Sequence, residues 1–335
     1  MLRYAIIGFG GLGKKHFCNL MQLEKKRKNF TLAAICGTTE AEAKKAVSLN
    51  LGTVDLSKID FSHCHFYHDY KEMIEIEKLD FIVSTVPTYL HKEIAVFALA
   101  KGIHVFSEKP MALTLDDCEA MLLAAQENGK YLMIGQCLRF HPAYKKVKEF
   151  IDSGAYGKVR SAYFERISQL PRWTWNNWIL DPAQSGGCIL DMHIHDVDLI
   201  NWFFGTPSSL RSTINSSKVP QESVCTQYGY KDFAVLSRAD WSLPQTFPFS
   251  GRCQIVFEKA SVSVANDRLS VYTDEDSYSE DYDPEEAFVE EMEAFLELVL
   301  EDKPCDVISP ESVYNSVKIA IKELESGMSK QEIYL

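Results

Sequence analysis

A histidine and a carboxylate four residues apart are the pair with the clearest chemical potential in this sequence. If the chain is helical from Leu190 onward, Asp191 and His195 share one face of that helix. An imidazole held by a carboxylate is a general acid/base pair, and the unperturbed pKa of histidine suits proton transfer near neutrality. We therefore predict acid/base chemistry at His195. The intervening His193 points roughly the other way, and we expect it to pack or to contact substrate rather than to catalyse.

A lysine at a strand end supplies a second chemical function. Lys109 lies in the segment SEKP directly after a predicted strand, and open α/β sheets bind ligands at the carboxyl ends of their strands. A lysine ammonium there can hydrogen-bond a substrate oxygen and stabilise negative charge that develops on it. The alternative is a solvated loop lysine.

A glycine-rich loop near the N-terminus predicts dinucleotide binding. It has the pattern G-x-G-x-x-G between an apolar run and a helical pattern. The first glycine allows a tight turn, the second lets the backbone approach a pyrophosphate at the helix N-terminus, and the third lets helix and strand pack closely. The loop comprises Gly8, Phe9, Gly10, Gly11, Leu12 and Gly13.

The end of the second predicted strand bears on the choice between NAD and NADP. An acid at this place binds the ribose hydroxyls of NAD and repels the 2′-phosphate of NADP. This chain instead has Gly37, Thr38 and Thr39, and Lys44 and Lys45 follow one helical turn later. The absent carboxylate favours NADP slightly over NAD. The alternative is that both cofactors are accepted.

The segment D-x-H-x-H-D around His195 also permits a metal interpretation. Its candidate ligands diverge on a helix, and hydride transfer to a nicotinamide needs no metal. We predict that the protein has no metal site.

A tryptophan-rich segment before the Asp191 helix favours sugar binding. Trp173, Trp175 and Trp178 lie beside arginines and asparagines. Aromatic faces accept the C–H groups of a sugar ring, and forked donors such as arginine bind its hydroxyls. We expect at least one of the three rings to line the substrate site. The alternative is that the tryptophans pack the domain or a subunit interface.

The elements that must position these residues alternate between strand and helix in the first 137 residues. Continuous apolar runs such as FIVST are typical of strands buried on both faces of a parallel sheet. The alternation predicts an α/β fold with an N-terminal, doubly wound Rossmann domain over residues 1–137. The expected strands are residues 2–7, 31–36, 81–85, 104–107 and 131–135.

Residues 138–335 have a different pattern and are predicted to form a second domain. Helical patterns mix with alternating, strand-like stretches, which indicates an α/β domain with a largely antiparallel sheet. The acidic stretch 274–286 is expected to be a solvated loop. The expected helices are residues 143–153, 191–204 and 287–300, and the expected strands are 159–165, 229–241, 253–257, 261–265 and 269–272.

Composition excludes several classes of partner. With 35 basic against 47 acidic side chains, the formal charge of −12 repels phosphate backbones, so we expect no nucleic-acid partner. No apolar run reaches the roughly 20 residues that span a bilayer, and the start of the chain runs straight into a strand, so we expect neither a membrane segment nor a leader. The nine cysteines contain no C-x-x-C pair, which indicates reduced thiols and a cytoplasmic location.

The ordered motifs resemble those of the Gfo/Idh/MocA oxidoreductase family over nearly the whole length. Besides the glycine pattern, which extends to His16, they are T-x-P-x-x-x-H (residues 85–91), E-K-P (108–110), R-F-x-P (139–142) and S-G-G-x-x-x-D-x-x-x-H-D-x-D (185–198). Thr88 stands where many relatives carry asparagine, so the contact to the nicotinamide side departs from the family pattern. Further cofactor contacts expected from the resemblance are Thr85, Val86, Pro87, His91, Glu108 and Lys109.

The resemblance implies that Lys109, Asp191 and His195 form a catalytic trio that also contacts substrate. We add Arg139 and Arg166 as expected substrate contacts. The implied reaction moves a hydride between NAD or NADP and a secondary hydroxyl or keto group of a sugar, polyol or inositol. The implied fold is a Rossmann domain followed by an α/β domain with a large, open, mainly antiparallel sheet. That sheet commonly forms the oligomer interface, so a homodimer or homotetramer is expected.

Two rival functions keep the same fold. Some relatives cleave glycosides by transient oxidation and elimination and return the hydride at the end. A non-catalytic sensor would only bind the nucleotide, and such a protein is expected to have lost the lysine or the histidine, whereas Lys109 and His195 are both present.

Overall fold

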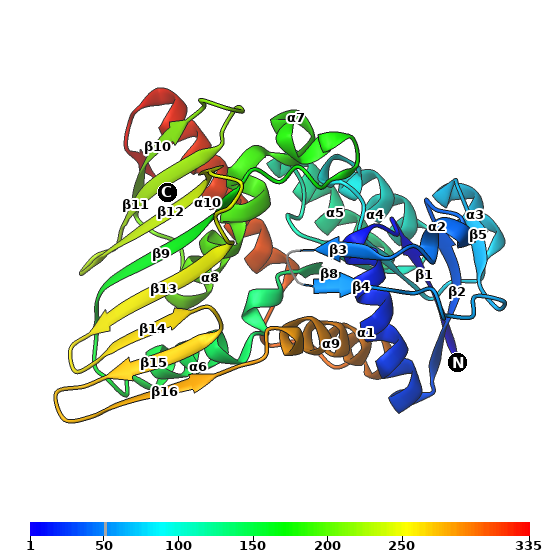
Figure 1. Cartoon of the computed structure of the whole chain (residues 1–335), viewed down its shortest axis with the longest axis horizontal. Helices are drawn as coiled ribbons and strands as arrows, with labels where there is room; N and C mark the ends of the chain where they lie inside the picture. Colours follow the sequence, from blue (N-terminus) through cyan, green and yellow to red (C-terminus); the bar gives the residue numbers. More distant parts are fainter. Residues whose placement is uncertain (50–51) are drawn as a thin grey trace. The chain divides into compact units, whose positions relative to one another are not determined.

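The chain folds into two compact units, each built from two stretches of sequence (Figure 1). The computed structural model describes residues 1–49 and 52–335. The first unit comprises Met1–Gly135 and Phe288–Glu311, and the second comprises Gln136–Ala287 and Ser312–Leu335.

The segment Phe288–Glu311 departs from the predicted domain boundary, which assigned every residue after 137 to the second domain. Most of it is the C-terminal part of helix α9 (Glu285–Glu301). Phe295 on this helix is fully buried, with its ring centroid 5.6 Å from those of both Phe81 and Phe106. The segment therefore completes the core of the first unit.

Six parallel strands form the sheet of the first unit, in the order β5-β2-β1-β6-β7-β8. This is the strand order of a doubly wound Rossmann domain, which confirms the predicted fold. The strand that reads FIVS is buried at every position, as in other parallel sheets. The strands are β1 (Leu2–Ile7), β2 (Phe30–Cys36), β5 (His65–Tyr67), β6 (Phe81–Ser84), β7 (His104–Glu108) and β8 (Leu132–Gly135).

One helix of the first unit, α5, begins and ends at signals present in the sequence. Thr114 caps the N-terminus of α5, where its side chain accepts the Asp117 N–H, and Gly129 ends the helix in the left-handed conformation. The elements are α1 (Gly11–Arg27), α2 (Glu40–Ala43), α3 (Tyr70–Ile76), the 3-10 turn η1 (Thr88–Leu90), α4 (His91–Ala100), α5 (Leu115–Asn128) and the hairpin β3 (Val47–Leu49) and β4 (Gly52–Val54).

A nine-stranded sheet forms the second unit, in the order β16-β15-β14-β13-β9-β12-β11-β10-β17. Within this sheet, only the β9–β12 pair is parallel among the described strands, so the sheet is mixed and mainly antiparallel, as predicted. The strands are β9 (Val159–Gln169), β10 (Ser209–Asn215), β11 (Ser223–Gly229), β12 (Ala234–Leu243), β13 (Ser250–Phe257), β14 (Ser261–Ala265), β15 (Arg268–Tyr272), β16 (Ser277–Asp281) and β17 (Ile333–Tyr334).

Helices cover one face of this sheet. Phe203 of α8 packs against Phe164 of β9, and a Cβ at Gly327 of α10 would lie 2.3 Å from the Ile214 side chain of β10. The remaining elements are η2 (Cys137–Arg139), α6 (Pro142–Ser153), η3 (Trp175–Leu180), α7 (Pro182–Ser185), the π turn η4 (Ile189–His193), α8 (Ile194–Phe204) and α10 (Pro310–Ser329).

The predicted strand 229–241 is confirmed over residues 234–241, which lie in β12, whereas its first residues are the end of β11 and the turn of a hairpin. β11 ends at Gly229 and β12 begins at Ala234. In the turn, the Tyr230 N–H donates to the Phe233 carbonyl at 3.0 Å, and the two rings stack with centroids 4.8 Å apart. Because aromatic residues stand on both sides of Lys231 and Asp232 in this turn, the hydrophobic pattern did not reveal the break.

The prediction of a loop over residues 274–286 is wrong for its central part. Strand β16 lies there and pairs antiparallel with β15. The Thr273 N–H donates to the Asp276 carbonyl and closes the turn between the two strands. Every residue of β16 is exposed, so its acidic composition is compatible with an edge strand.

No helix among residues 1–49 and 52–335 is both long enough and apolar enough to cross a membrane.

Candidate active site

The glycine loop joins β1 to α1, and glycine is required for a different steric reason at each glycine position of the G-x-G-x-x-G motif. Gly8 has φ of +86°, and a Cβ there would lie 2.9 Å from the Thr85 backbone. A Cβ at Gly13 would lie only 2.2 Å from the Gly8 carbonyl oxygen, so this glycine permits close helix–strand packing.

Gly10 differs because nothing lies within 4 Å of the position that its Cβ would occupy. It is the N-cap of α1 and makes no side-chain capping hydrogen bond. Open space beside an uncapped helix N-terminus fits a pyrophosphate. The Phe9 side chain instead packs against Phe17 and Phe61, so only the backbone of Phe9 is available to a cofactor.

The loop after β2 contains the glycine and the two threonines that were expected to contact the cofactor. Gly37 has φ of +90°. Thr39 caps α2 by accepting the Glu42 N–H at 3.3 Å. The two lysines that follow the loop are paired with acids, Lys44 with Glu40 at 2.7 Å and Lys45 with Glu42 at 2.6 Å. The predicted preference for NADP over NAD gains no support from this loop.

The T-x-P-x-x-x-H segment (residues 85–91) hydrogen-bonds the glycine loop and the loop after β7. The Thr85 hydroxyl donates to the Gly8 carbonyl. His91 is buried, with Nδ1 2.8 Å from the Pro110 carbonyl and Nε2 3.0 Å from the Val86 carbonyl. Burial lowers the pKa of His91. Its ring therefore ties the loop after β6 to the loop after β7, and a direct cofactor contact by the ring is disfavoured.

Lys109 follows the last residue of β7 and lies at the carboxyl end of the sheet. Its backbone N–H donates to Glu108 Oε2 at 3.2 Å, while Glu108 Oε1 lies 2.6 Å from His16 Nε2. Burial would raise the pKa of Glu108, but the hydrogen bond and charge of His16 outweigh it and lower that pKa. A second acid, Glu291 of α9, joins His16 and Glu108 in the only set of three potential metal-ligand groups found in the described residues.

In the second unit, Asp191 and His195 lie on the partly exposed side of the π turn and α8. A π turn is a wide helical turn that is frequent at functional sites. Two glycines with positive φ, Gly186 and Gly187, precede it and let the chain enter the turn.

His193, on the same stretch, is fully buried. Its Nε2 lies 3.2 Å from Glu323 Oε1, and Tyr228 hydrogen-bonds the same carboxylate. Burial lowers the pKa of His193, but the Glu323 charge outweighs it, so the pKa is raised overall. This side chain belongs to the core of the second unit.

The two arginines expected to contact substrate are held inside the second unit. Arg139 is 2% exposed and forms a bidentate pair with Asp198, with both N–O distances 2.7 Å. Arg166 is 6% exposed and donates to Asp196 at 2.8 Å. Because these guanidinium groups pair with the acids of the H-D-x-D motif, the geometry favours anchoring of α8 over contact with substrate.

The tryptophan segment is accessible. Trp173 and Trp175 are 51% and 71% exposed, and Trp178 is partly exposed. Asn176 and Asn177 between them both have positive φ. Exposed rings are available to a ligand or to another subunit, because the core of the second unit does not enclose them.

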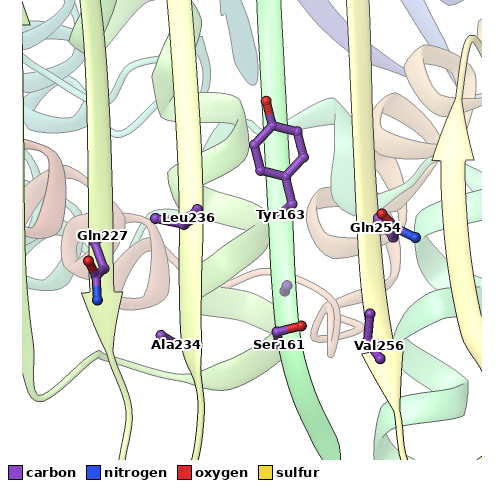
Figure 2. A pocket seen from close by; sticks show the side chains of 8 residues that line it. Ser161, Tyr163, Gln227, Ala234, Leu236, Gln254 and Val256 are labelled. Atoms are coloured by element: carbon purple, nitrogen blue, oxygen red, sulfur yellow. The ribbon is translucent and has the colours of Figure 1, made fainter.

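A shallow hollow of about 330 Å³ lies elsewhere, on the face of the nine-stranded sheet that carries Tyr163 and Leu236 (Figure 2). Side chains from neighbouring strands line it, and it contains none of the predicted catalytic residues. The lining residues are Ser161, Ala162, Tyr163, Gln227, Ala234, Leu236, Gln254 and Val256.

Two family models match the chain. Residues 2–136 match an oxidoreductase family with an NAD-binding Rossmann fold, and residues 144–263 match a Gfo/Idh/MocA C-terminal domain. Both models belong to the same family, and they match the two parts of the chain in order.

Curated relatives include dehydrogenases and a hydratase. Inositol 2-dehydrogenase of Salmonella typhimurium is 26% identical over 68% of this chain and 69% of that protein. The scyllo-inositol 2-dehydrogenase (NAD(+)) of Bacillus subtilis is 26% identical over 78% of this chain and 73% of that protein. The 2,7-anhydro-N-acetylneuraminate hydratase of Mediterraneibacter gnavus is 27% identical over 60% of this chain, and the match spans 49% of that protein.

Solved structures with the same fold cover the whole chain. Levoglucosan dehydrogenase, in complex with NADH and levoglucosan, has a TM-score of 0.85 at 18% identity and covers 99% of both chains. Myo-inositol 2-dehydrogenase from Lactobacillus plantarum has a TM-score of 0.80 at 23% identity, with coverage of 100% of this chain and 99% of that chain. At these identities the likeness shows the fold alone.

Proposed function

Because the chain belongs to the Gfo/Idh/MocA oxidoreductase family and has an NAD-binding Rossmann domain, we propose that it moves a hydride between a nicotinamide cofactor and a sugar, polyol or inositol. The reacting group is a secondary hydroxyl or its ketone. The observation that carries this proposal is the partial exposure of Asp191 and His195 on a stretch whose other charged side chains are buried in ion pairs. The names of the inositol and levoglucosan dehydrogenases support the substrate class.

The three proposed catalytic side chains have distinct tasks. His195 takes the proton of the substrate hydroxyl. Asp191 orients the imidazole and stabilises its charged form. Lys109 hydrogen-bonds the substrate oxygen and stabilises the negative charge that develops on it. The bound nicotinamide supplies the acceptor or donor of the hydride.

The loop after β2 leads us to propose that the site accepts both NAD(H) and NADP(H). Residues 37–39 carry no carboxylate to repel a 2′-phosphate. The nearby Lys44 and Lys45 are paired with Glu40 and Glu42. These two lysines therefore give no preference for the 2′-phosphate of NADP.

Trp173, Trp175 and Trp178 are proposed as the sugar-binding platform. Their exposure supports this role because a ring that stacks on a sugar must present its face. Replacement of the contacting ring by alanine is expected to raise KM for the sugar while cofactor affinity stays unchanged.

We also propose that copies of the chain associate through the face of the nine-stranded sheet shown in Figure 2. Leu236 on this face is 47% exposed, Tyr163 lies beside it on the neighbouring strand β9, and Val256 lies one strand further away on β13. Apolar side chains at the centre of a sheet face favour burial against a second copy.

A cytoplasmic location is proposed from the cysteines. All nine are free thiols in the structure, as in proteins of reducing compartments.

A second candidate function returns the hydride at the end of the reaction, as in glycoside cleavage by transient oxidation and elimination. The hydratase among the relatives favours it, because a hydration has no net redox change. In this case a substrate is consumed while no reduced nicotinamide accumulates.

A substrate panel tests the proposal and separates the two candidates. Sugars, sugar acids, inositols and glycosides are each incubated with the protein and either cofactor. We expect reduced nicotinamide to accumulate with at least one sugar or inositol. Release of an aglycone without net reduction would support the second candidate, and no turnover of any member would contradict both.

A further inference from the structure

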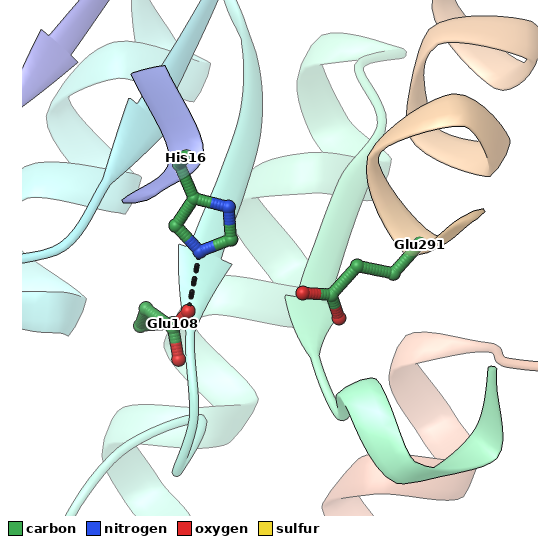
Figure 3. Close-up of side chains that lie close together, drawn as sticks. All are labelled: His16, Glu108 and Glu291. Carbon is green, nitrogen blue, oxygen red and sulfur yellow. Dashed lines mark hydrogen bonds and ion pairs between the residues drawn. The ribbon is translucent and has the colours of Figure 1, made fainter. Parts of the chain in front are cut away.

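His16, Glu108 and Glu291 form a buried polar cluster inside the first unit (Figure 3). They come from α1, β7 and α9, and one potential ligand atom of each lies within 4.8 Å of the others. The three residues are 0%, 5% and 0% exposed. Neither carboxylate oxygen of Glu291 has a hydrogen-bond partner among the described residues. A carboxyl group in such a place needs a proton or a cation to neutralise it.

A metal ion is disfavoured by the geometry of the other two side chains. His16 Nε2 and Glu108 Oε1 are 2.6 Å apart, in direct hydrogen-bond contact. Two ligands bound to one ion at about 2.1 Å each would stand clearly farther apart in a tetrahedral site. The contact between these two atoms therefore holds a proton.

The His16–Glu108 contact also determines which of the two carboxyl groups is protonated. Glu108 is stabilised as a carboxylate by His16 and by the Lys109 charge. Burial, and after it the like charge of Glu108, raise the pKa of Glu291 well above its ordinary value. The rings of Phe106 and Phe288 lie 5.3 and 6.3 Å from the imidazole of His16 and exclude solvent from the cluster. Two carboxyl groups this close together in a site shielded from water do not both ionise.

We propose that Glu291 is a positioning residue for Lys109. In this role Glu291 is a neutral carboxylic acid that lies beside the His16–Glu108 pair. The link runs through Glu108, whose other oxygen accepts the backbone N–H of Lys109 at 3.2 Å. While Glu291 is neutral, the His16 imidazole hydrogen-bonds Glu108 alone, and the E-K-P loop is held. When Glu291 ionises as the pH rises, it competes for His16 and loosens that hold. The inference rests on the catalytic role proposed for Lys109.

Unfolding at several pH values tests the bound proton without any substrate. A carboxyl whose pKa is raised by folding binds more protons in the native state, so it loses stabilising effect as pH rises above the unfolded pKa of about 4.3. The unfolding equilibrium constant of the wild type should therefore rise relative to Glu291→Gln, by up to about tenfold per pH unit, until Glu291 ionises. Glu286→Gln, an exposed acid of the same helix, is the control and should follow the wild type. Identical pH dependence of wild type and Glu291→Gln would overturn the inference.

Hydrogen exchange of the Lys109 amide tests the positioning, again without substrate. Its protection, corrected for the intrinsic pH dependence of exchange, should fall in the wild type as the pH rises through the ionisation of Glu291 and stay constant in Glu291→Gln. Once a substrate is known, kcat of the wild type should fall more steeply with rising pH than that of Glu291→Gln, with equal cofactor affinity. Equal protection profiles would show that Glu291 does not act on Lys109. If only the kcat profiles coincide while the exchange profiles differ, the catalytic role of Lys109 is what fails.

Discussion

On the stretch from Ile189 to Phe204, both histidine and aspartate occur once in a partly exposed position and otherwise in buried positions. His193, Asp196 and Asp198 are buried and paired with Glu323, Arg166 and Arg139. Asp191 and His195 stay partly exposed. Substitutions at the first group are expected to change stability, and substitutions at the second group are expected to change turnover.

His195→Ala and Lys109→Ala should each lower kcat by about 10²-fold or more, the scale of a lost acid/base or oxyanion contact. Cofactor affinity should change little, because the roles proposed for the two side chains involve the substrate oxygen and not the cofactor phosphates. Steady-state kinetics and cofactor titration measure the two quantities. His193→Ala is the control, and it should lower the melting temperature instead, since it leaves Glu323 buried without its imidazole. Near-native turnover of either alanine variant would refute the role assigned to that residue.

Cofactor choice is best tested at Thr38. Gly37 has φ of +90°, so a side chain there would strain the backbone, whereas Thr38 has an ordinary φ. Thr38→Asp should weaken NADP(H) binding by about tenfold or more and leave NAD(H) binding nearly unchanged, because a carboxylate repels the 2′-phosphate. Thr38→Asn is the uncharged control, and fluorescence titration gives the affinities. A wild type that binds only NAD(H) tightly would contradict dual acceptance.

At the scale of elements, helix α8 is held by buried ion pairs rather than by apolar contacts alone. Arg139→Ala leaves Asp198 as a buried charge without its bidentate partner. The free energy of unfolding should fall by about 3–5 kcal/mol. Arg160→Ala, which removes an exposed ion pair with Glu258, should cost less than about 1 kcal/mol. Chemical denaturation provides both values, and equal losses would mean that the buried pair does not anchor the helix.

The loop between β1 and α1 gives a matched pair of glycine variants. A Cβ at Gly13 would clash with the Gly8 carbonyl, whereas a Cβ at Gly10 meets open space. Gly13→Ala should lower the melting temperature of the cofactor-free protein. Gly10→Ala should leave that temperature unchanged and weaken cofactor binding by about tenfold, since it fills the space left for the pyrophosphate. Normal cofactor affinity of Gly10→Ala would place the pyrophosphate elsewhere.

The sequence predicts elements well where the pattern is local. The strand Leu2–Ile7 agrees at both ends, because an apolar run is followed directly by glycines. Helix α10 and strands β5 and β10 have no counterpart in the prediction. β5 is only three residues long, and the pairing of β10 with β11 and β17 depends on distant contacts.

The site shows the same limit. The motifs identify Lys109, Asp191 and His195, but the fates of Arg139 and Arg166 depend on partners distant in sequence. Glu291 carries no signal of its own, because a glutamate on an acidic amphipathic helix normally faces solvent. Only the packing of α9 in the first unit reveals that it is buried.

At the scale of the whole molecule, the face of the nine-stranded sheet that bears Leu236 should hold copies of the chain together. Leu236→Asp places a charge in the proposed contact and should lower the molar mass measured by light scattering. Leu123→Asp is the control, since Leu123 is similarly exposed, at 53% against 47%, but lies on α5 of the other unit. A wild type that is monomeric at all concentrations would contradict the proposed association.

The most direct test of the proposed function follows a label from substrate to cofactor. The first active sugar or inositol from the panel is deuterated at its carbinol carbon and incubated with the wild type and with His195→Ala. The account predicts deuterium at the nicotinamide ring with the wild type and about 10²-fold slower transfer with His195→Ala. Turnover without deuterium in the cofactor, or equal transfer rates for both proteins, would contradict it.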